Sequence, residues 1–151
     1  MRIRVSETRN TRNVVIVFIL FVLAAPALFQ SCSATIANYD PIALDKAVTL
    51  KLKSLELVEK AEETYASHEK EIRELMREIE QAYEYAANIP KNSLTARQWQ
   101  VLKDPDSNLL GGFFTSWAKN GKLNPVLIRE AAGIINQAFT AIIRLETLKN
   151  R

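Results

Sequence analysis

Few residues in this 151-residue chain are of the types that carry catalysis or bind metals, and they do not cluster. The chain has one histidine, His68, and one cysteine, Cys32. A zinc site needs three or four His, Cys or carboxylate ligands, and a carboxylate-bridged di-iron bundle needs paired Glu-x-x-His motifs. His68 lies in a polar stretch and belongs to neither pattern. We therefore expect no metal and no cofactor, and we interpret His68 as a solvated or interface side chain.

Acidic residues suggest two further kinds of site. Asp104, Asp106 and Asn108 match the first three odd positions of a calcium-binding loop, but Leu109 stands where that loop needs glycine. A turn rich in Asp and Asn explains the segment equally well. The acids between residues 56 and 84 lie among lysines and arginines, which is typical of a solvated surface. We therefore expect no catalytic residue and no enzymatic activity.

Cys32 differs from these because of the segment that precedes it. Residues 2–12 carry four arginines and one acid, and residues 14–29 form an uncharged apolar run of 16 residues. A permanent transmembrane helix needs about 20 apolar residues to cross the bilayer core. The run is short for that purpose and fits the core of a secretory signal peptide. Pro26 is predicted to break this helix just before its end.

The tetrapeptide Phe29-Gln30-Ser31-Cys32 resembles the processing box of bacterial lipoproteins. The resemblance implies that residues 1–31 are a signal peptide and that Cys32 becomes the acylated first residue of the mature chain. Ser31 suits the small residue expected before the cut, whereas Phe29 and Gln30 depart from the usual leucine and small residue. Ser33 stands where an aspartate retains enterobacterial lipoproteins in the inner membrane. The resemblance therefore implies the periplasmic face of the outer membrane.

Two alternatives for the leader remain open. A simple secretory signal cut after Ala25-Pro26-Ala27 fits the small-x-small rule. An uncleaved anchor in the inner membrane fits the absence of charge from Val14 to Ala37. Acylation has the advantage of explaining the single cysteine, since an unpaired thiol is a liability in an oxidising compartment.

Length and charge bound the mature part of the chain. Residues 32–151 number 120, the size of one ordinary domain. The leader holds four of the 20 basic residues and one of the 17 acidic residues, so 16 of each sign remain. This balance is no basis for nucleic-acid binding. We expect a signal peptide over residues 1–31, an acylated cysteine and tether over 32–40, and one domain over 41–151, held together by apolar packing.

The domain is predicted to begin with a long helix. Asp40-Pro41 is a helix start, because Asp caps free N–H groups and proline suits the first turn. No Gly or Pro follows until Ile89-Pro90, and apolar residues recur in steps of three and four. A continuous helix here is about 70 Å long, so it needs a partner helix or breaks. The weakest stretch runs from Glu59 to Glu71, and we expect any kink there.

Two short helices and one long helix are predicted to follow. Thr95-Ala96-Arg97-Gln98 has the form of a capping box for the first, and Gly111-Gly112 introduces the second, over residues 113–119. Asn120-Gly121 ends the second helix, and Asn124-Pro125 starts the last one. The last helix is apolar on two sides, so we expect it at the buried centre of the fold. Its apolar stripe is Ile128, Ala131, Ile135, Ala138, Ile142 and Leu145.

The predicted fold is therefore all-α. The long helix packs antiparallel against the C-terminal helix as in a helical bundle or coiled coil, and the two short helices bridge one end. We see no strand with a period of two residues.

Aromatic residues concentrate around the second short helix and support two interpretations. Phe113, Phe114 and Trp117 lie in a glycine-hinged apolar segment. They either close the hydrophobic core or form, with Trp99, an exposed aromatic patch that anchors a partner. The partner-binding hypothesis rests on these four residues.

The sequence thus favours a lipoprotein that acts as a binding or scaffolding module. We expect attachment to the membrane through the lipid on Cys32, and contact with a protein partner or with a second copy along the long helix. The competing hypotheses are an inner-membrane protein with an uncleaved anchor and an enzyme acting on cell-wall material. The enzyme needs a cleft with converging polar groups.

Overall fold

A computed structural model describes residues 36–150 and confirms the all-α class. Over this range the chain forms α-helices and one 3₁₀ turn and contains no strand. The elements are α2 (Pro41–Glu59), η2 (Lys60–Glu62), α3 (Tyr65–Asn88), α4 (Ser93–Lys103), α5 (Leu110–Asn120) and α6 (Pro125–Leu148). The leader and Cys32 lie outside the described residues.

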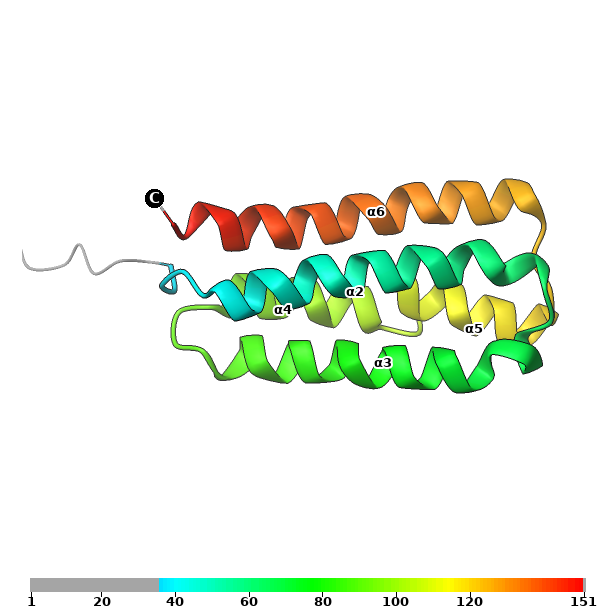
Figure 1. Ribbon diagram of the computed structural model, residues 1–151, viewed down its shortest axis with the longest axis horizontal. Coiled ribbons are helices and arrows are strands. Elements are labelled where there is room, and N and C mark those ends of the chain that lie inside the picture. Colours follow the sequence, from blue (N-terminus) through cyan, green and yellow to red (C-terminus); the bar gives the residue numbers. More distant parts are fainter. Residues whose placement is uncertain (1–35, 151) are drawn as a thin grey trace, which may run out of the picture. The chain divides into compact units, whose positions relative to one another are not determined.

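The helices form a four-cornered bundle. Helix α2 packs against α6 and α3, while α4 packs against α3 and α6. Helices α4 and α5 follow one another along the bundle and together occupy its fourth corner, and α6 runs antiparallel to α2 (Figure 1).

The predicted long helix is interrupted between Lys60 and Thr64. The break falls within the weak stretch that starts at Glu59, and it turns the chain back so that α2 and α3 lie side by side. The backbone of the loop between α5 and α6 forms hydrogen bonds with the polar groups that the break leaves without helical partners. Leu123 N–H donates to the Ala61 carbonyl at 2.9 Å, and Tyr65 N–H donates to the Gly121 carbonyl at 2.8 Å. Of the two expectations, a partnered continuous helix or a break, the structure has the break, because tertiary hydrogen bonds replace the intrahelical bonds here.

Both predicted Asx-Pro helix starts are confirmed. The Asp40 carboxylate accepts from Ile42 N–H at 2.8 Å, and the Asn124 side chain accepts from Leu127 N–H at 2.9 Å. Gly121 ends α5 with a positive φ of 74°, as its place after Asn120 predicts.

The two short helices begin earlier than predicted. Helix α4 starts at Ser93, so Thr95 lies inside the first turn instead of capping it. Helix α5 starts at Leu110 and includes both glycines. A Cβ on Gly111 would lie 2.5 Å from the Asp104 carbonyl oxygen, and one on Gly112 would overlap the Ser107 carbonyl. The glycines therefore serve the close packing of α5 against the end of α4.

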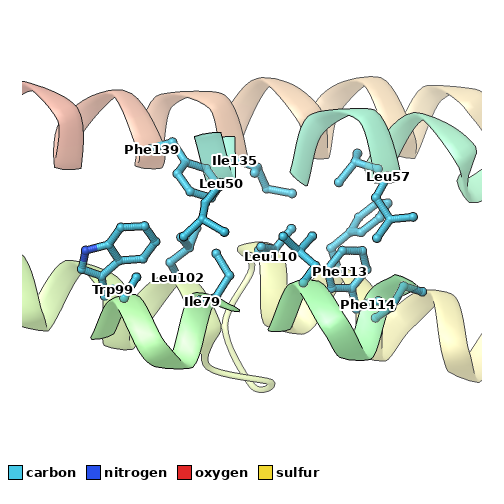
Figure 2. Packing of buried hydrophobic residues seen from close by; sticks show 14 of the residues in the cluster. Leu50, Leu57, Ile79, Trp99, Leu102, Leu110, Phe113, Phe114, Ile135 and Phe139 are labelled. Atoms are coloured by element: carbon cyan, nitrogen blue, oxygen red, sulfur yellow. The ribbon is translucent and has the colours of Figure 1, made fainter. Parts of the chain in front are cut away.

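The core runs the length of the bundle and contains the aromatic residues (Figure 2). Trp117 is completely buried, and Trp99, Phe113 and Phe114 are each at least nine-tenths buried. The Trp99 ring meets the Phe139 ring edge-on at 5.8 Å. The hypothesis of an exposed aromatic patch at Trp99, Phe113, Phe114 and Trp117 is therefore contradicted, and the core interpretation holds. Each of these large rings buries much apolar area, so their burial contributes substantially to a fold without a disulfide.

Candidate interaction surface

Helix α6 lies at a corner of the bundle and not at its buried centre, which corrects the prediction. Its inward side chains, Ile128, Ile135, Phe139 and Ile142, are buried against the other helices. A corner helix can bury one side, and α6 is apolar on two. An apolar row therefore remains uncovered.

We call this row the α6 seam. Its residues recur in alternating steps of four and three, the spacing of a coiled-coil seam, and none of them is polar. Ile134 is 48% exposed, and the alanines near it are exposed or half-buried. The α6 seam consists of Leu127, Ala131, Ile134, Ala138, Ala141, Leu145 and Leu148.

Helix α4 adds exposed apolar side chains next to this seam. Leu94 is 59% exposed and Val101 is 46% exposed, and they lie two turns apart. Between α4 and α6 runs an open groove of about 430 Å³, which we call the α4–α6 groove. Its lining residues are Leu94, Arg97, Gln98, Val101, Leu109, Ala138 and Ala141.

The seam and the groove together form one apolar face. Contiguous apolar patches on folded proteins mark sites of contact with other molecules, whereas isolated apolar side chains do not. The amide oxygen of Gln98, which lines the groove, is shielded from solvent and has no hydrogen-bond partner among residues 36–150. The face is therefore mainly apolar, and the described residues that line it offer no converging set of polar groups.

Helix α6 also satisfies the length and composition of a membrane-spanning helix. In the described fold it packs against α2 and α4 and keeps the polar residue Glu146 inside the bundle. Length and composition alone therefore do not distinguish a spanning helix from a bundle helix with an exposed apolar side.

His68 is not solvated, which was one of the two settings expected for it. It is nine-tenths buried, with Nε2 at 2.8 Å from a Glu63 carboxylate oxygen and Nδ1 at 3.4 Å from Glu71. Its ring lies 5.6 Å from the Trp117 ring, whose N–H donates to the Glu63 carbonyl. The hydrogen bond from His68, followed by the charge of Lys60, lowers the pKa of Glu71. These contacts close the turn between α2 and α3.

No grouping of three or more His, Cys, Asp or Glu suited to a metal ion occurs in the described part of the chain. The calcium-loop candidate forms a turn, in which the Asp104 carboxylate accepts from Asp106 N–H at 3.0 Å. This matches the interpretation of that segment as an Asp-rich turn.

A buried polar cluster at the opposite end of the bundle escaped the sequence analysis. Glu146 is 1% exposed, pairs with Lys149, and accepts from the Thr95 hydroxyl at 3.0 Å. Lys149 also donates to Asn92 at 2.6 Å. The second Glu146 oxygen has no partner within residues 36–150. A cavity of about 10 Å³ borders Glu146, which is roughly the space of one water molecule.

This cluster joins the start of α4 to the end of α6 close to where the described chain begins. Nearby, the Tyr85 hydroxyl donates to the Asp40 carboxylate, which caps α2. That hydrogen bond, aided by the N–H groups of Ile42 and Ala43, lowers the pKa of Asp40. The same hydrogen bond raises the pKa of Tyr85.

The i,i+3 spacing of Glu146 and Lys149 was the only signal of the buried polar cluster in the sequence, but this spacing does not reveal that the pair is buried.

Comparison with known proteins gives no further guide. No protein-family model, no curated protein and no solved structure matches this chain.

Proposed function

We propose that the protein is a membrane-tethered helical binding module whose α4–α6 face contacts a protein partner. The observation that carries the proposal is this exposed apolar face, which combines the α4–α6 groove with the α6 seam. Binding proceeds by burial of apolar side chains, and the module performs no chemistry of its own.

The tether in this proposal is acylated Cys32 at the periplasmic face of the outer membrane. Support comes from the basic leader, the apolar run and the lipoprotein-like residues that precede Cys32. Helix α2 begins at Pro41, so the chain between Cys32 and the bundle spans at most about 30 Å. A body held this close to the bilayer meets partners in or at the same membrane.

Acylation is tested with labelled palmitate and intact-mass measurement of protein from cells. We expect label in the wild type, no label and a smaller membrane fraction for Cys32→Ala, and a mature chain without residues 1–31. Retention of those residues on an unmodified thiol would support the uncleaved inner-membrane anchor. Label retained by Cys32→Ala would refute the tether.

The binding face is tested by site-specific photo-crosslinking in cells. A photoreactive residue at Arg97, on the rim of the groove, is expected to give discrete adducts, which Val101→Glu abolishes. Leu52→Glu is the matched control, because Leu52 is exposed on α2. Adducts that survive Val101→Glu, or that Leu52→Glu also abolishes, would count against the face.

The competing enzyme hypothesis has its own test. Turnover of envelope polymers by the purified protein would replace the binding proposal. The α4–α6 groove does not favour this outcome, because it is lined mainly by leucine, valine and alanine.

A further inference from the structure

We propose that the partner is a second copy of this chain, and that two α6 helices pair antiparallel through their seams around a two-fold axis near residue 136. The inference rests on the proposed function, since it names the occupant of the same face. Three features of α6 support it.

The first feature is the symmetry of side-chain size along the α6 seam. Leucines stand at Leu127 and Leu145, and three alanines with Ile134 fill the positions between them. In an antiparallel pair about this axis, Leu127 faces Leu145 of the second copy and Ala131 faces Ala141. Ile134 faces Ala138. The same contacts occur twice, as a two-fold interface requires.

The second feature is the small size of the central residues. Ala131, Ala138 and Ala141 let two helix backbones approach closely, since interaxial distance depends on the side chains at the contact. The neighbouring groove extends the contact, so a second α6 also covers Leu94 and Val101.

The third feature is the charge beside the seam. Glu130 and Arg144 lie on the same flank of α6, with Gln137 midway between them. Neither Glu130 nor Arg144 takes part in the ion pairs within residues 36–150. In the antiparallel pair, Glu130 of each copy faces Arg144 of the other, and Gln137 faces Gln137. A parallel pair would put Glu130 level with Glu130 and Arg144 level with Arg144, and would therefore bring no opposite charges together.

A lipid surface is the main competing occupant, because α6 is apolar enough for a membrane. A bilayer selects neither the size pattern of the seam nor the order of charges along its flank. The flank residues Glu130 and Arg144 would also enter the interface with lipid and lose solvation. A tether that confines copies to one membrane raises their effective concentration, so a modest helix–helix contact suffices.

The oligomeric state of the full-length protein, extracted in mild detergent, tests the inference by sedimentation over a dilution series. We expect a dimer for the wild type. Ala141→Glu is expected to weaken it by a factor on the order of 100, because it buries an unpaired charge at the contact. Glu84→Arg on α3 is the control and is expected to leave the dimer unchanged. A monomer for the wild type at all concentrations overturns the inference.

Charge reversal tests the pairing more finely without touching the core. Glu130→Arg and Arg144→Glu are each expected to weaken the dimer by about tenfold, and the double variant Glu130→Arg/Arg144→Glu is expected to restore it. Failure of the double variant to recover refutes the antiparallel register.

Thiol crosslinking of full-length chains that carry Cys32→Ser tests whether the two α6 helices are antiparallel. A mixture of Glu130→Cys and Arg144→Cys chains is expected to crosslink with a short bismaleimide, whereas Glu130→Cys alone is not. Crosslinking of Glu130→Cys with itself would show a parallel pair and overturn the proposal.

The outcomes separate this inference from the proposed function. A monomer that still gives a foreign adduct from the Arg97 position overturns the second copy and keeps the binding module. If the Cys32→Ser protein binds vesicles of phosphatidylethanolamine and phosphatidylglycerol and Ala141→Glu releases it, the occupant is lipid, and both proposals for this face fail.

Discussion

Glu146 and Lys149 form an ion pair inside the bundle, with both side chains almost completely shielded from water. Such a pair adds little net stability over an apolar one, but removal of one partner leaves a buried charge uncompensated. The Thr95 hydroxyl donates to one Glu146 oxygen and Lys149 donates to Asn92, while the second Glu146 oxygen has no partner within residues 36–150. The cluster therefore fixes how α4 meets α6, next to the candidate interaction surface.

Glu146→Ala is expected to lower the free energy of unfolding by about 3–5 kcal/mol, because the Lys149 ammonium loses its countercharge. The double variant Glu146→Leu/Lys149→Met is expected to recover most of that loss. Urea unfolding followed by circular dichroism measures both. A single variant that stays within about 1 kcal/mol of the wild type would show that Lys149 leaves the interior or loses its proton.

The Asp40–Tyr85 hydrogen bond predicts a pH-dependent contribution to stability. The pKa of Asp40 is lowered in the folded protein, so its contribution is present above the unfolded-state pKa and is lost as the pH falls through the folded-state pKa. The pKa of Tyr85 is raised, so its contribution is lost as the pH rises through the folded-state value.

Tyr85→Phe is therefore expected to be less stable than the wild type at neutral pH. In strong acid its stability is expected to match that of the wild type, because Asp40 is then protonated in both proteins. Unfolding midpoints measured from pH 2 to pH 8 check this. A difference between the two proteins that stays constant down to the lowest pH would exclude the Asp40 carboxylate as the cause.

At the scale of elements, the junction between α4 and α5 depends on two glycines. The first turn of α5 lies against carbonyls at the end of α4 and, at Gly112, against the Ser107 carbonyl of the connecting loop, so a side chain on Gly111 or Gly112 has no space. Gly133 lies in the middle of α6, and a Cβ there meets no atom within 4 Å. The same substitution therefore has opposite expected effects at these positions.

Gly111→Ala is expected to destabilise the fold by more than about 1 kcal/mol, because overpacked backbone must shift. Gly133→Ala is expected to stabilise it by about 0.5–1 kcal/mol, because alanine favours helix over glycine. Thermal unfolding of both variants compares them. Equal effects of the two changes would mean that the close approach at α5 does not restrict the backbone.

At the scale of the whole molecule, the described residues contain more apolar side chains than the core buries, and the remainder lie exposed on the surface. The buried aromatic side chains concentrate around α5, whereas the exposed large apolar side chains lie mainly on α2, α4 and α6. Different residues therefore contribute to stability and to the proposed interaction, and substitutions can change one property without the other.

Trp117→Ala is expected to cost about 3–5 kcal/mol, a large share of the 5–15 kcal/mol of a typical domain, and to unfold much of the protein. Val101→Ala, on the exposed groove, is expected to change stability by less than about 0.5 kcal/mol. Chemical denaturation distinguishes them. A folded Trp117→Ala protein with near wild-type stability would contradict the core role of this ring.

The helical class and most helix ends were predictable because their causes are local. The capping side chains of Asp40 and Asn124 bind N–H groups within three residues, and Pro90 and Gly121 act on their own backbone. The acylation of Cys32 stays a prediction from the leader, since it lies outside the described residues.

The residue pattern alone predicted amphipathic helices with defined starts and a last helix that is apolar on two sides, a surplus that was expected to be buried. Tertiary structure alone decided where that surplus lies. At the break between α2 and α3, Tyr65 N–H donates to the Gly121 carbonyl and Leu123 N–H donates to the Ala61 carbonyl, and Trp117 is buried against the same turn. These backbone groups are far apart in the sequence, so their pairing produces no periodic pattern of residues from which it could be predicted. The packing of α2 and α4 against α6 therefore determines which side of α6 faces water.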